Sequence, residues 1–268
     1  MLLFLRKSMK PQSFLPRMIL ALALPLELAV ILSVPGIVHS QPVDTGLSER
    51  LLVAQSRPTR RTRRLSFRPP SFGAPARRRG ASVRGGCGAS QEQMIPVLPE
   101  ITPALTAEKY PTLFVYMPET VAKTAELVVK DAGTKELVYK VPFTLSAKNG
   151  ILGLSLPTDG TVPALEVGKS YNWTFSVICD ATDRSGDMVV SGQVKRVEVN
   201  QTLSKQLETA LAGDRPALYA ESGLWYDAVD SLMRLRLAAP NDVVLKMDWK
   251  DLLRSVKLDA IVEKPLIS

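Results

Sequence analysis

The two cysteines of this sequence have only a few possible chemical roles: a disulfide, a metal site or buried thiols. Cys87 and Cys179 are the only cysteines among 268 residues. In an oxidising compartment an even pair of cysteines usually forms a disulfide. A metal site is disfavoured, because neither cysteine has a histidine or a further cysteine near it in the sequence. The sequence therefore predicts a disulfide between Cys87 and Cys179, with two buried thiols as the alternative.

Histidine chemistry is almost absent from the chain. The one histidine, His39, lies at the end of an N-terminal apolar segment. If that segment is removed, the mature chain has no imidazole to activate a serine or cysteine nucleophile or to bind a metal. We therefore predict no catalytic residue and expect no cofactor. A hydrolase that uses carboxylates stays open as a third interpretation, although no carboxylate pair is singled out.

One loop carries the residue type that binds hard cations. Asp180, Asp183 and Asp187 lie close together in the sequence and offer carboxylate oxygens of the kind that bind Ca²⁺. Their spacing does not match an EF-hand loop. A solvated hairpin loop, in which Arg184 balances the charge, is the favoured interpretation. The three aspartates remain weak calcium candidates, and no other metal site is predicted.

The first forty residues predict export. Basic residues precede an apolar segment over residues 18–38, and the small residue Ser40 ends it. This is the layout of a secretory signal peptide that is cleaved after Ser40. Glu27 and Pro35 make the segment a poor membrane span, so an uncleaved membrane anchor is only the alternative. We expect residues 1–40 to be the signal peptide and the mature protein to be periplasmic or secreted.

Positive charge is concentrated in one part of the chain. Residues 49–84 contain eleven arginines and one acidic residue, whereas residues 85–268 contain 19 basic and 23 acidic residues. Residues 41–92 are rich in Arg, Pro, Gly and Ser, which predicts a disordered linker. Outside the cytoplasm, an anionic envelope surface or an acidic protein rather than nucleic acid is the expected partner, and a spacer that binds nothing is the alternative. The candidate polyanion contacts are Arg60, Arg61, Arg63, Arg64, Arg77, Arg78 and Arg79.

Residues 93–200 have the pattern of short β-strands. Apolar or alternating runs are separated by turn signals, such as the one at residues 131–134. The clearest run extends from Tyr171 to Cys179, where every second residue belongs to an apolar face. About six such strands predict a mainly β fold, an antiparallel β-sandwich.

Residues 201–268 change to helical periodicity. Leu203 begins a stripe of leucines at helical spacing. The segment from Gly223 to Ala228, followed by Pro240, resembles the second half of a tetratricopeptide repeat. A single repeat cannot bury its own apolar face, so we expect a C-terminal helical hairpin that packs on the sandwich.

Four short segments carry a family pattern. They are an Arg–Gly run that ends at Cys87 (residues 78–87) and the segments at residues 165–173, 179–185 and 223–228. In this order they resemble a secreted cyanobacterial family, domain of unknown function 928, over about residues 75–265. The resemblance implies an exported protein, periplasmic or beyond if the source is a cyanobacterium, and it implies that both cysteines belong to the pattern. It implies no activity, substrate or catalytic residue.

These features together predict an exported, non-enzymatic interaction or scaffold protein with an unidentified protein partner in the cell envelope. Trp225 and Tyr226 are the candidate interaction surface at the junction of sandwich and helices, and core packing is the alternative for both. The alternative function is binding of anionic lipid or polysaccharide through the Arg-rich linker. The carboxylate hydrolase is the third.

Overall fold

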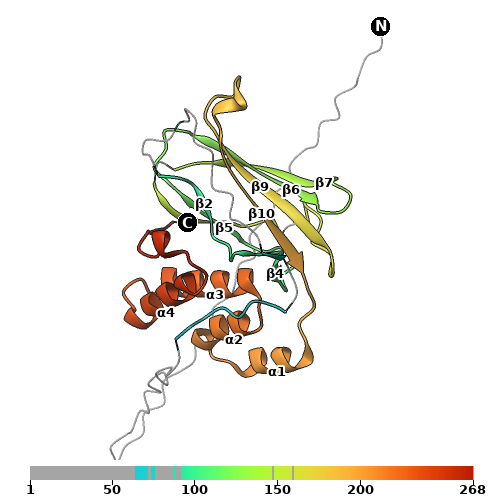
Figure 1. The fold of residues 1–268 in the computed structure, drawn as a ribbon, viewed down its shortest axis with the longest axis vertical. Coiled ribbons are helices and arrows are strands. Elements are labelled where there is room, and N and C mark those ends of the chain that lie inside the picture. Colours follow the sequence, from blue (N-terminus) through green and yellow to red (C-terminus); the bar gives the residue numbers. More distant parts are fainter. Residues whose placement is uncertain are drawn as a thin grey trace, which may run out of the picture. The chain divides into compact units, whose positions relative to one another are not determined.

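A computed structural model describes residues 64–71, 74–75, 87, 92–146, 148–158 and 160–267. All of them belong to one compact unit that begins at Pro58. Two β-sheets lie on one side of this unit and four helices on the other (Figure 1). The predicted signal peptide and most of the predicted linker lie outside the described residues.

The larger sheet has five strands in the order β4-β10-β9-β6-β7. Strand β4 is parallel to β10, and the other neighbours are antiparallel. The central strand β9 is the predicted alternating strand, and its side chains from Tyr171 to Val177 are buried at every second position. The strands are β4 (Ala104–Thr106), β6 (Thr124–Asp131), β7 (Leu137–Thr144), β9 (Ser170–Ile178) and β10 (Met188–Arg196).

The smaller sheet has four strands in the order β11-β8-β5-β2. All five residues of β5 are buried, as expected of a continuous apolar run. The last strand, β11, returns from the C-terminus to pair in parallel with β8. The strands are β2 (Ile95–Pro96), β5 (Leu113–Met117), β8 (Gly150–Leu154) and β11 (Leu266–Ile267). A separate pair is formed by β1 (Ala74–Pro75) and β3 (Ile101–Thr102).

The expected sandwich-like, strand-rich architecture is therefore confirmed, but its details differ. The two sheets contain nine strands rather than about six, and both are mixed rather than antiparallel. The additional edge strands are two or three residues long. Strands this short contain too few residues to show an alternating pattern, so the sequence gives no signal for them.

Four helices follow the sheets. Two of them begin at side-chain caps: Asn200 accepts a hydrogen bond from the Leu203 amide (2.8 Å), and Asp242 accepts one from the Val244 amide (2.8 Å). The helices are α1 (Gln201–Thr209), α2 (Arg215–Glu221), α3 (Trp225–Ala238) and α4 (Val243–Arg254). Short 3₁₀ turns occur at Arg184–Gly186, Ala212–Asp214 and Asp259–Ile261.

The likeness to a tetratricopeptide repeat is not confirmed. Gly223 has a backbone φ of +77° and lies in the turn that links α2 to α3, where a residue without a Cβ atom is favoured. A Cβ atom there would lie 3.3 Å from the Arg68 carbonyl oxygen and 3.4 Å from the Pro70 ring. Gly223 therefore makes room for a segment of chain that precedes the sheets, which the repeat pattern does not explain.

The helices and the sheets share one hydrophobic core. Trp173 of β9, Trp225 of α3 and Trp249 of α4 are all fully buried and belong to the same cluster. The indole N–H of Trp225 donates to the Val97 carbonyl (2.8 Å), and that of Trp173 donates to the Tyr226 hydroxyl (2.8 Å). Because these bonds are buried, they fix the angle at which α3 packs on the sheet.

Residues 64–70, which we call the strap, pack against the helices (Figure 1, the light-blue segment). The side chains of Leu65 and Phe67 are only 3% and 7% exposed, and the Phe67 ring contacts Trp225 edge to face at 5.0 Å. The prediction that all of residues 41–92 form a disordered linker is therefore wrong for the strap. The reason is local, since two apolar side chains two residues apart suffice to anchor an extended segment.

The two cysteines lie at disulfide distance, with their Cα atoms 5.1 Å apart and a separation of 92 positions in the sequence. Cys179 directly follows β9. The backbone of Cys87 is held by two further bonds, because its carbonyl accepts from the Thr120 hydroxyl (2.8 Å) and from the Val121 amide (3.1 Å). The pair thus joins the end of the Arg-rich region to the end of the central strand.

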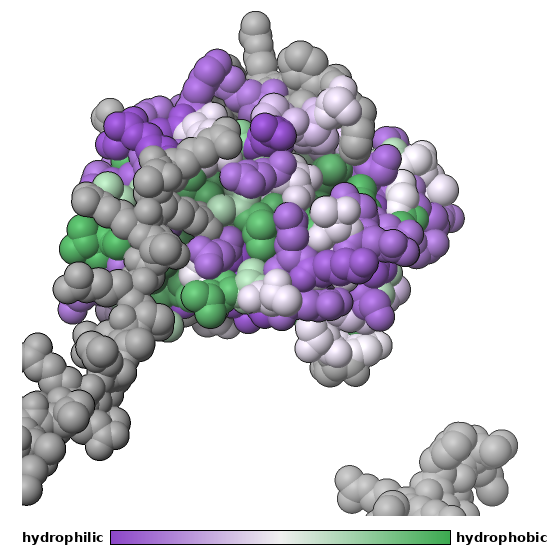
Figure 2. Space-filling view, turned by 90° about the horizontal axis from the view of Figure 1, so that it is seen from below, coloured by the Kyte–Doolittle hydropathy of each residue, from purple (hydrophilic) through white to green (hydrophobic). Residues whose placement is uncertain are grey.

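The surface on the helical side is mixed in character. Figure 2 shows polar side chains over most of this face, with apolar side chains exposed between them. Four of the exposed large apolar side chains lie where α3 ends and α4 begins: Leu237, Val243, Val244 and Met247. Among the described residues, no helix has both the length and the apolar character needed to cross a bilayer.

The disulfide generates a stability prediction. Replacing Cys87 by serine should lower the free energy of unfolding by about 2–5 kcal/mol, because the unfolded chain gains the freedom of a loop of more than ninety residues. Denaturant unfolding of the wild type, Cys87→Ser and the Cys87→Ser/Cys179→Ser double variant would measure it. Two alkylatable thiols in the native wild-type protein, seen by intact mass, would contradict the pairing.

Candidate functional site: a cleft between the sheets and helix α3

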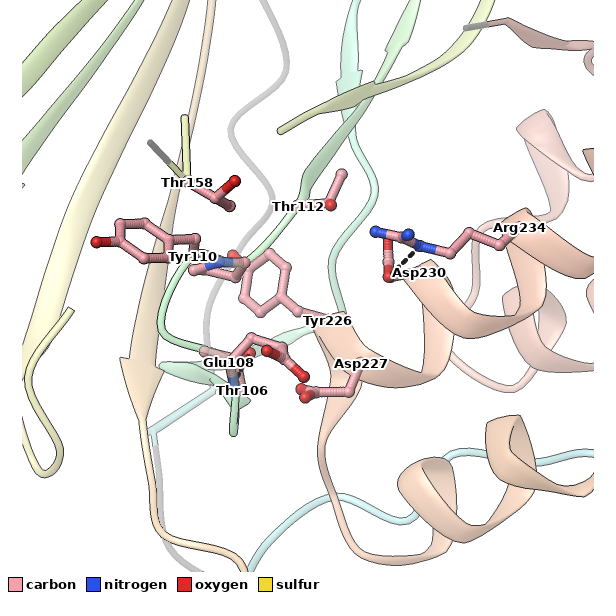
Figure 3. Close-up of a pocket in the computed structure, with 10 residues that line it drawn as sticks. Thr106, Glu108, Tyr110, Thr112, Thr158, Tyr226, Asp227, Asp230 and Arg234 are labelled. Atoms are coloured by element: carbon pink, nitrogen blue, oxygen red, sulfur yellow. Dashed lines mark hydrogen bonds and ion pairs between the residues drawn. The ribbon is translucent and has the colours of Figure 1, made fainter. Parts of the chain in front are cut away.

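A cleft of about 340 Å³ lies where the sheets meet α3, and we call it the junction cleft (Figure 3). Most of the residues that line it are polar. Three carboxyl groups and one guanidinium group are among them, together with hydroxyl groups and two tyrosine rings. The lining residues are Thr106, Glu108, Tyr110, Pro111, Thr112, Thr158, Tyr226, Asp227, Asp230 and Arg234.

Two parts of the fold supply the walls of the junction cleft. One wall is the connection between β4 and β5, which runs from Thr106 to Thr112 and is completed by Thr158 after β8. The other wall is α3, where Asp227, Asp230 and Arg234 are spaced three and four residues apart. This spacing places all three on one face of the helix.

Asp227 is the most unusual residue of the junction cleft. Its side chain is only 5% exposed, and both carboxyl oxygens accept a hydrogen bond from the Ala107 amide at 3.2 Å. Burial raises the pKa of Asp227 from its ordinary value of 3.8 to about 7, although the bonds from Ala107 and Thr106 oppose the shift and the charge of Glu108 adds to it. Near neutral pH, Asp227 therefore exists in both protonation states.

Glu108 is the second carboxylate at this end of the cleft. It is exposed, and it lies beside Asp227 with the two carboxyl groups next to one another (Figure 3). Within the part of the chain that the structure describes, Glu108 makes no ion pair. The two carboxyl groups thus make this end of the cleft acidic.

The far end of the cleft is closer to electrical balance. Arg234 donates from Nε to Asp230 at 2.7 Å, four residues earlier on α3. Hydroxyl groups lie between the two ends, and that of Thr112 is 3.3 Å from the hydroxyl of Ser155. Figure 3 shows the ring of Tyr110 and the hydroxyl of Thr158 on the sheet side of the opening. The cleft is therefore acidic at one end and close to neutral at the other.

This arrangement is suited to holding a cation. The exposed carboxylate of Glu108 provides the acceptor that a guanidinium or ammonium group requires, and the carboxyl of Asp227 lies beside it. A carboxyl with a raised pKa beside a second carboxylate also occurs in hydrolases. Here, however, both oxygens of Asp227 are occupied by the Ala107 amide, and the side chain is almost wholly buried. Glu108 is therefore the exposed acceptor of the pair, and Asp227 acts on a cation in the cleft through its charge rather than by direct contact or proton transfer.

The two aromatic residues predicted at the junction lie in the core. Trp225 and Tyr226 are 0% and 1% exposed, so neither presents its ring to a partner at the surface. The Tyr226 hydroxyl accepts from Trp173 and donates to the Gln193 carbonyl (3.3 Å). Core packing, the alternative, describes both residues, although Tyr226 also lines the inner end of the junction cleft.

The acidic loop does not gather its carboxylates around one point. Asp180 accepts from Thr182, Asp183 accepts from the Ser185 amide (2.9 Å), and Asp187 pairs with Arg184. Within the described ranges there is no group of three His, Cys, Asp or Glu residues that could hold a metal ion.

The arginines predicted to contact polyanions are mostly outside the described residues. Arg64 is described and exposed at the start of the strap. Those outside are Arg60, Arg61, Arg63, Arg77, Arg78 and Arg79.

The carboxylates of the junction cleft were missed by sequence reasoning. One signal for Asp227 does exist, since it is the only charged residue in the apolar run from Leu224 to Val229. A charge at a core position of a helix must find a partner or change its pKa. Glu108 has no comparable signal, because an isolated glutamate in a loop resembles any solvated surface residue.

The raised pKa of Asp227 gives a pH prediction. Between pH 4 and about 7 the unfolded chain loses this proton while the folded chain keeps it, so the free energy of unfolding should fall as the pH rises. Below pH 4 and above about pH 7, the contribution of Asp227 to the free energy of unfolding should not change with pH. Asp227→Asn should remove this slope, and denaturant unfolding of both proteins across the range measures the difference. If the difference in unfolding free energy between the wild type and Asp227→Asn does not change with pH, or changes with the opposite sign, the carboxyl is not buried in this way.

Comparison with known proteins identifies a family but no activity. No curated protein and no solved structure matches the chain. The model of a family described as Domain of Unknown Function (DUF928) matches residues 77–266, which include both cysteines and the whole junction cleft and exclude the strap. This match covers well over half of the sequence, and the chain therefore belongs to the DUF928 family.

Proposed function

We propose that the chain is an exported, non-enzymatic interaction protein whose junction cleft receives a basic side chain of a protein partner. The observation that carries this proposal is the exposed carboxylate of Glu108 beside the buried carboxyl of Asp227, because neither group forms an ion pair among the described residues. A partner arginine or lysine would supply the missing charge.

The size of the cleft supports a side chain rather than a larger ligand. Pockets for small molecules and cofactors have volumes of about 300–1,000 Å³. At about 340 Å³, the junction cleft lies at the lower end of this range. An extended arginine side chain is long and narrow, and its planar fork matches the acceptor geometry of carboxylates. Such a group would also contact the ring of Tyr110, since aromatic faces attract guanidinium ions.

Burial of Asp227 makes the interaction sensitive to pH. A cation favours the ionised form of a neighbouring carboxyl, so binding should pull the pKa of Asp227 down from about 7. By linkage, the affinity for a cation should rise as the pH increases through this region. The partner would consequently be held more tightly at pH 8 than at pH 6.

Export is part of the proposal. The first forty residues have the layout of a signal peptide, and the described cysteine pair is typical of an oxidising compartment. These two features together support a periplasmic or secreted location. Fractionation of the native host, with intact-mass analysis of the recovered chain, would find the mature N-terminus at Gln41. Recovery of reduced protein that keeps residues 1–40 in the cytosol would contradict this location.

A carboxylate hydrolase is the second candidate, and the raised pKa of Asp227 beside Glu108 is the observation that favours it. The two candidates differ in what they require of Glu108. A hydrolase needs this residue for turnover of a substrate, whereas a binding protein needs it only for affinity. Screening of ester, amide and glycoside substrates with the wild type and with Glu108→Gln distinguishes them.

Arginine amide and citrulline amide are matched probes for the junction cleft. Citrulline has nearly the same shape as arginine but carries no charge. We expect arginine amide to bind at pH 8 and citrulline amide to bind at least tenfold more weakly, a difference of about 1.4 kcal/mol. Isothermal titration at low salt, which avoids screening of exposed charges, measures both affinities.

The variant Glu108→Gln should lose most of the affinity for arginine amide, because it removes the exposed carboxylate and keeps the shape of the side chain. Glu208→Gln is the matched control, since Glu208 is an exposed glutamate on α1 outside the cleft. Equal affinity of wild type and Glu108→Gln, or equal binding of the arginine and citrulline probes, would contradict the proposed function.

A further inference from the structure

The strap binds to the rest of the protein in the way that a peptide binds to a receptor. Its seat consists of four residues: Ala220, Gly223, Trp225 and Ser255. The Phe67 amide donates to the Ser255 hydroxyl (3.0 Å), and the Arg68 amide donates to the Ala220 carbonyl (3.0 Å). Backbone bonds of this kind hold an extended segment regardless of its side chains.

Side-chain contacts make the seat selective. The Phe67 ring lies edge to face against Trp225, and Ser255 is itself fixed by donation to the Leu252 carbonyl (2.7 Å). Gly223 leaves room for the backbone of Arg68 and the ring of Pro70. A hollow of about 280 Å³ continues beside Phe67 and Pro69. The seat therefore prefers an extended segment with an aromatic residue followed, two and three residues later, by prolines.

The seat and its occupant are separable parts of the chain. All four residues of the seat lie within the family segment, residues 77–266, whereas the strap precedes it. Strand β1, which follows the strap, makes only a two-residue pairing with β3. This short pairing is the only one that β1 would have to break to follow the strap, among the strand pairings of the described residues. The chain from Pro75 to Cys87 has a maximum extended length of roughly 40 Å.

We infer that the strap seat is a docking site for the strap of a second copy of this chain, so that two copies exchange the strap together with β1 and form a dimer. Every contact that the strap makes within one chain is available between two chains of the same sequence. Exchange of an identical element is a common route to dimers because no contact is lost. The structure shows the closed arrangement, which short tethers favour until the protein concentration approaches the millimolar range.

A peptide experiment tests whether the seat accepts a strap from outside. The probe is a fluorescein-labelled peptide of residues 62–71, and the receptor is the full chain with Phe67→Ala, whose own strap is weakened. We expect saturable binding to this variant and at least tenfold weaker binding to the wild type, where the resident strap competes. The same peptide with alanine in place of Phe67 should not bind. Equal binding to both receptors, or none, overturns the inference.

Exchange itself is tested by mixing ¹⁴N- and ¹⁵N-labelled wild-type protein at about 1 mM, followed by native mass spectrometry. Mixed dimers should form, and excess peptide should dissociate them. Monomers alone, or dimers that persist unchanged in the Phe67→Ala variant, would overturn the inference. If circular dichroism shows that Phe67→Ala is unfolded, Arg68→Pro replaces it in both experiments, since it removes the bond to Ala220 and leaves the seat intact.

Discussion

The contact between the centre of the larger sheet and the first turn of α3 determines the rest of this structure. Trp173 donates to the hydroxyl of Tyr226, which in turn donates to the backbone of β10, and the neighbouring Trp225 donates to Val97. These buried polar groups have fixed partners, so α3 can pack on the sheets in one orientation only. The next residue, Asp227, is thereby brought against the Thr106–Ala107 backbone, and the junction cleft opens beside it.

The same contact explains why a carboxyl group is buried. A helix residue directly after two core aromatics has little freedom to turn toward solvent. Asp227 is satisfied by the Ala107 amide, yet burial still raises its pKa toward neutrality. The fold thus produces a titratable group at the base of an acidic cleft as a consequence of its core packing. On the opposite face of α3, Trp225 supports the strap through Phe67, so one helix turn serves both the cleft and the strap seat.

The sequence patterns predicted the strands and helices that have a regular spacing of apolar residues. The alternation from Tyr171 to Cys179 predicted the strand β9, and the helical periodicity of residues 201–268 agrees with the four helices found there. Edge strands of two or three residues could not be predicted, because their pairing depends on where distant segments end. The strap was missed for a similar reason, since Leu65 and Phe67 lie in an Arg-rich and Pro-rich region whose composition suggests disorder. The seat that accepts them is built more than 150 residues later in the sequence.

Direct titration of the Asp227 carboxyl tests the account of the junction cleft most closely. ¹³C NMR of a chain labelled at aspartate side chains would follow this group from pH 4 to pH 9, with and without arginine amide. The account predicts a pKa near 7 in the free protein and a clear decrease when arginine amide is present, with citrulline amide leaving it unchanged. A pKa near the ordinary value for aspartate, or a raised pKa that does not respond to arginine amide, would contradict it.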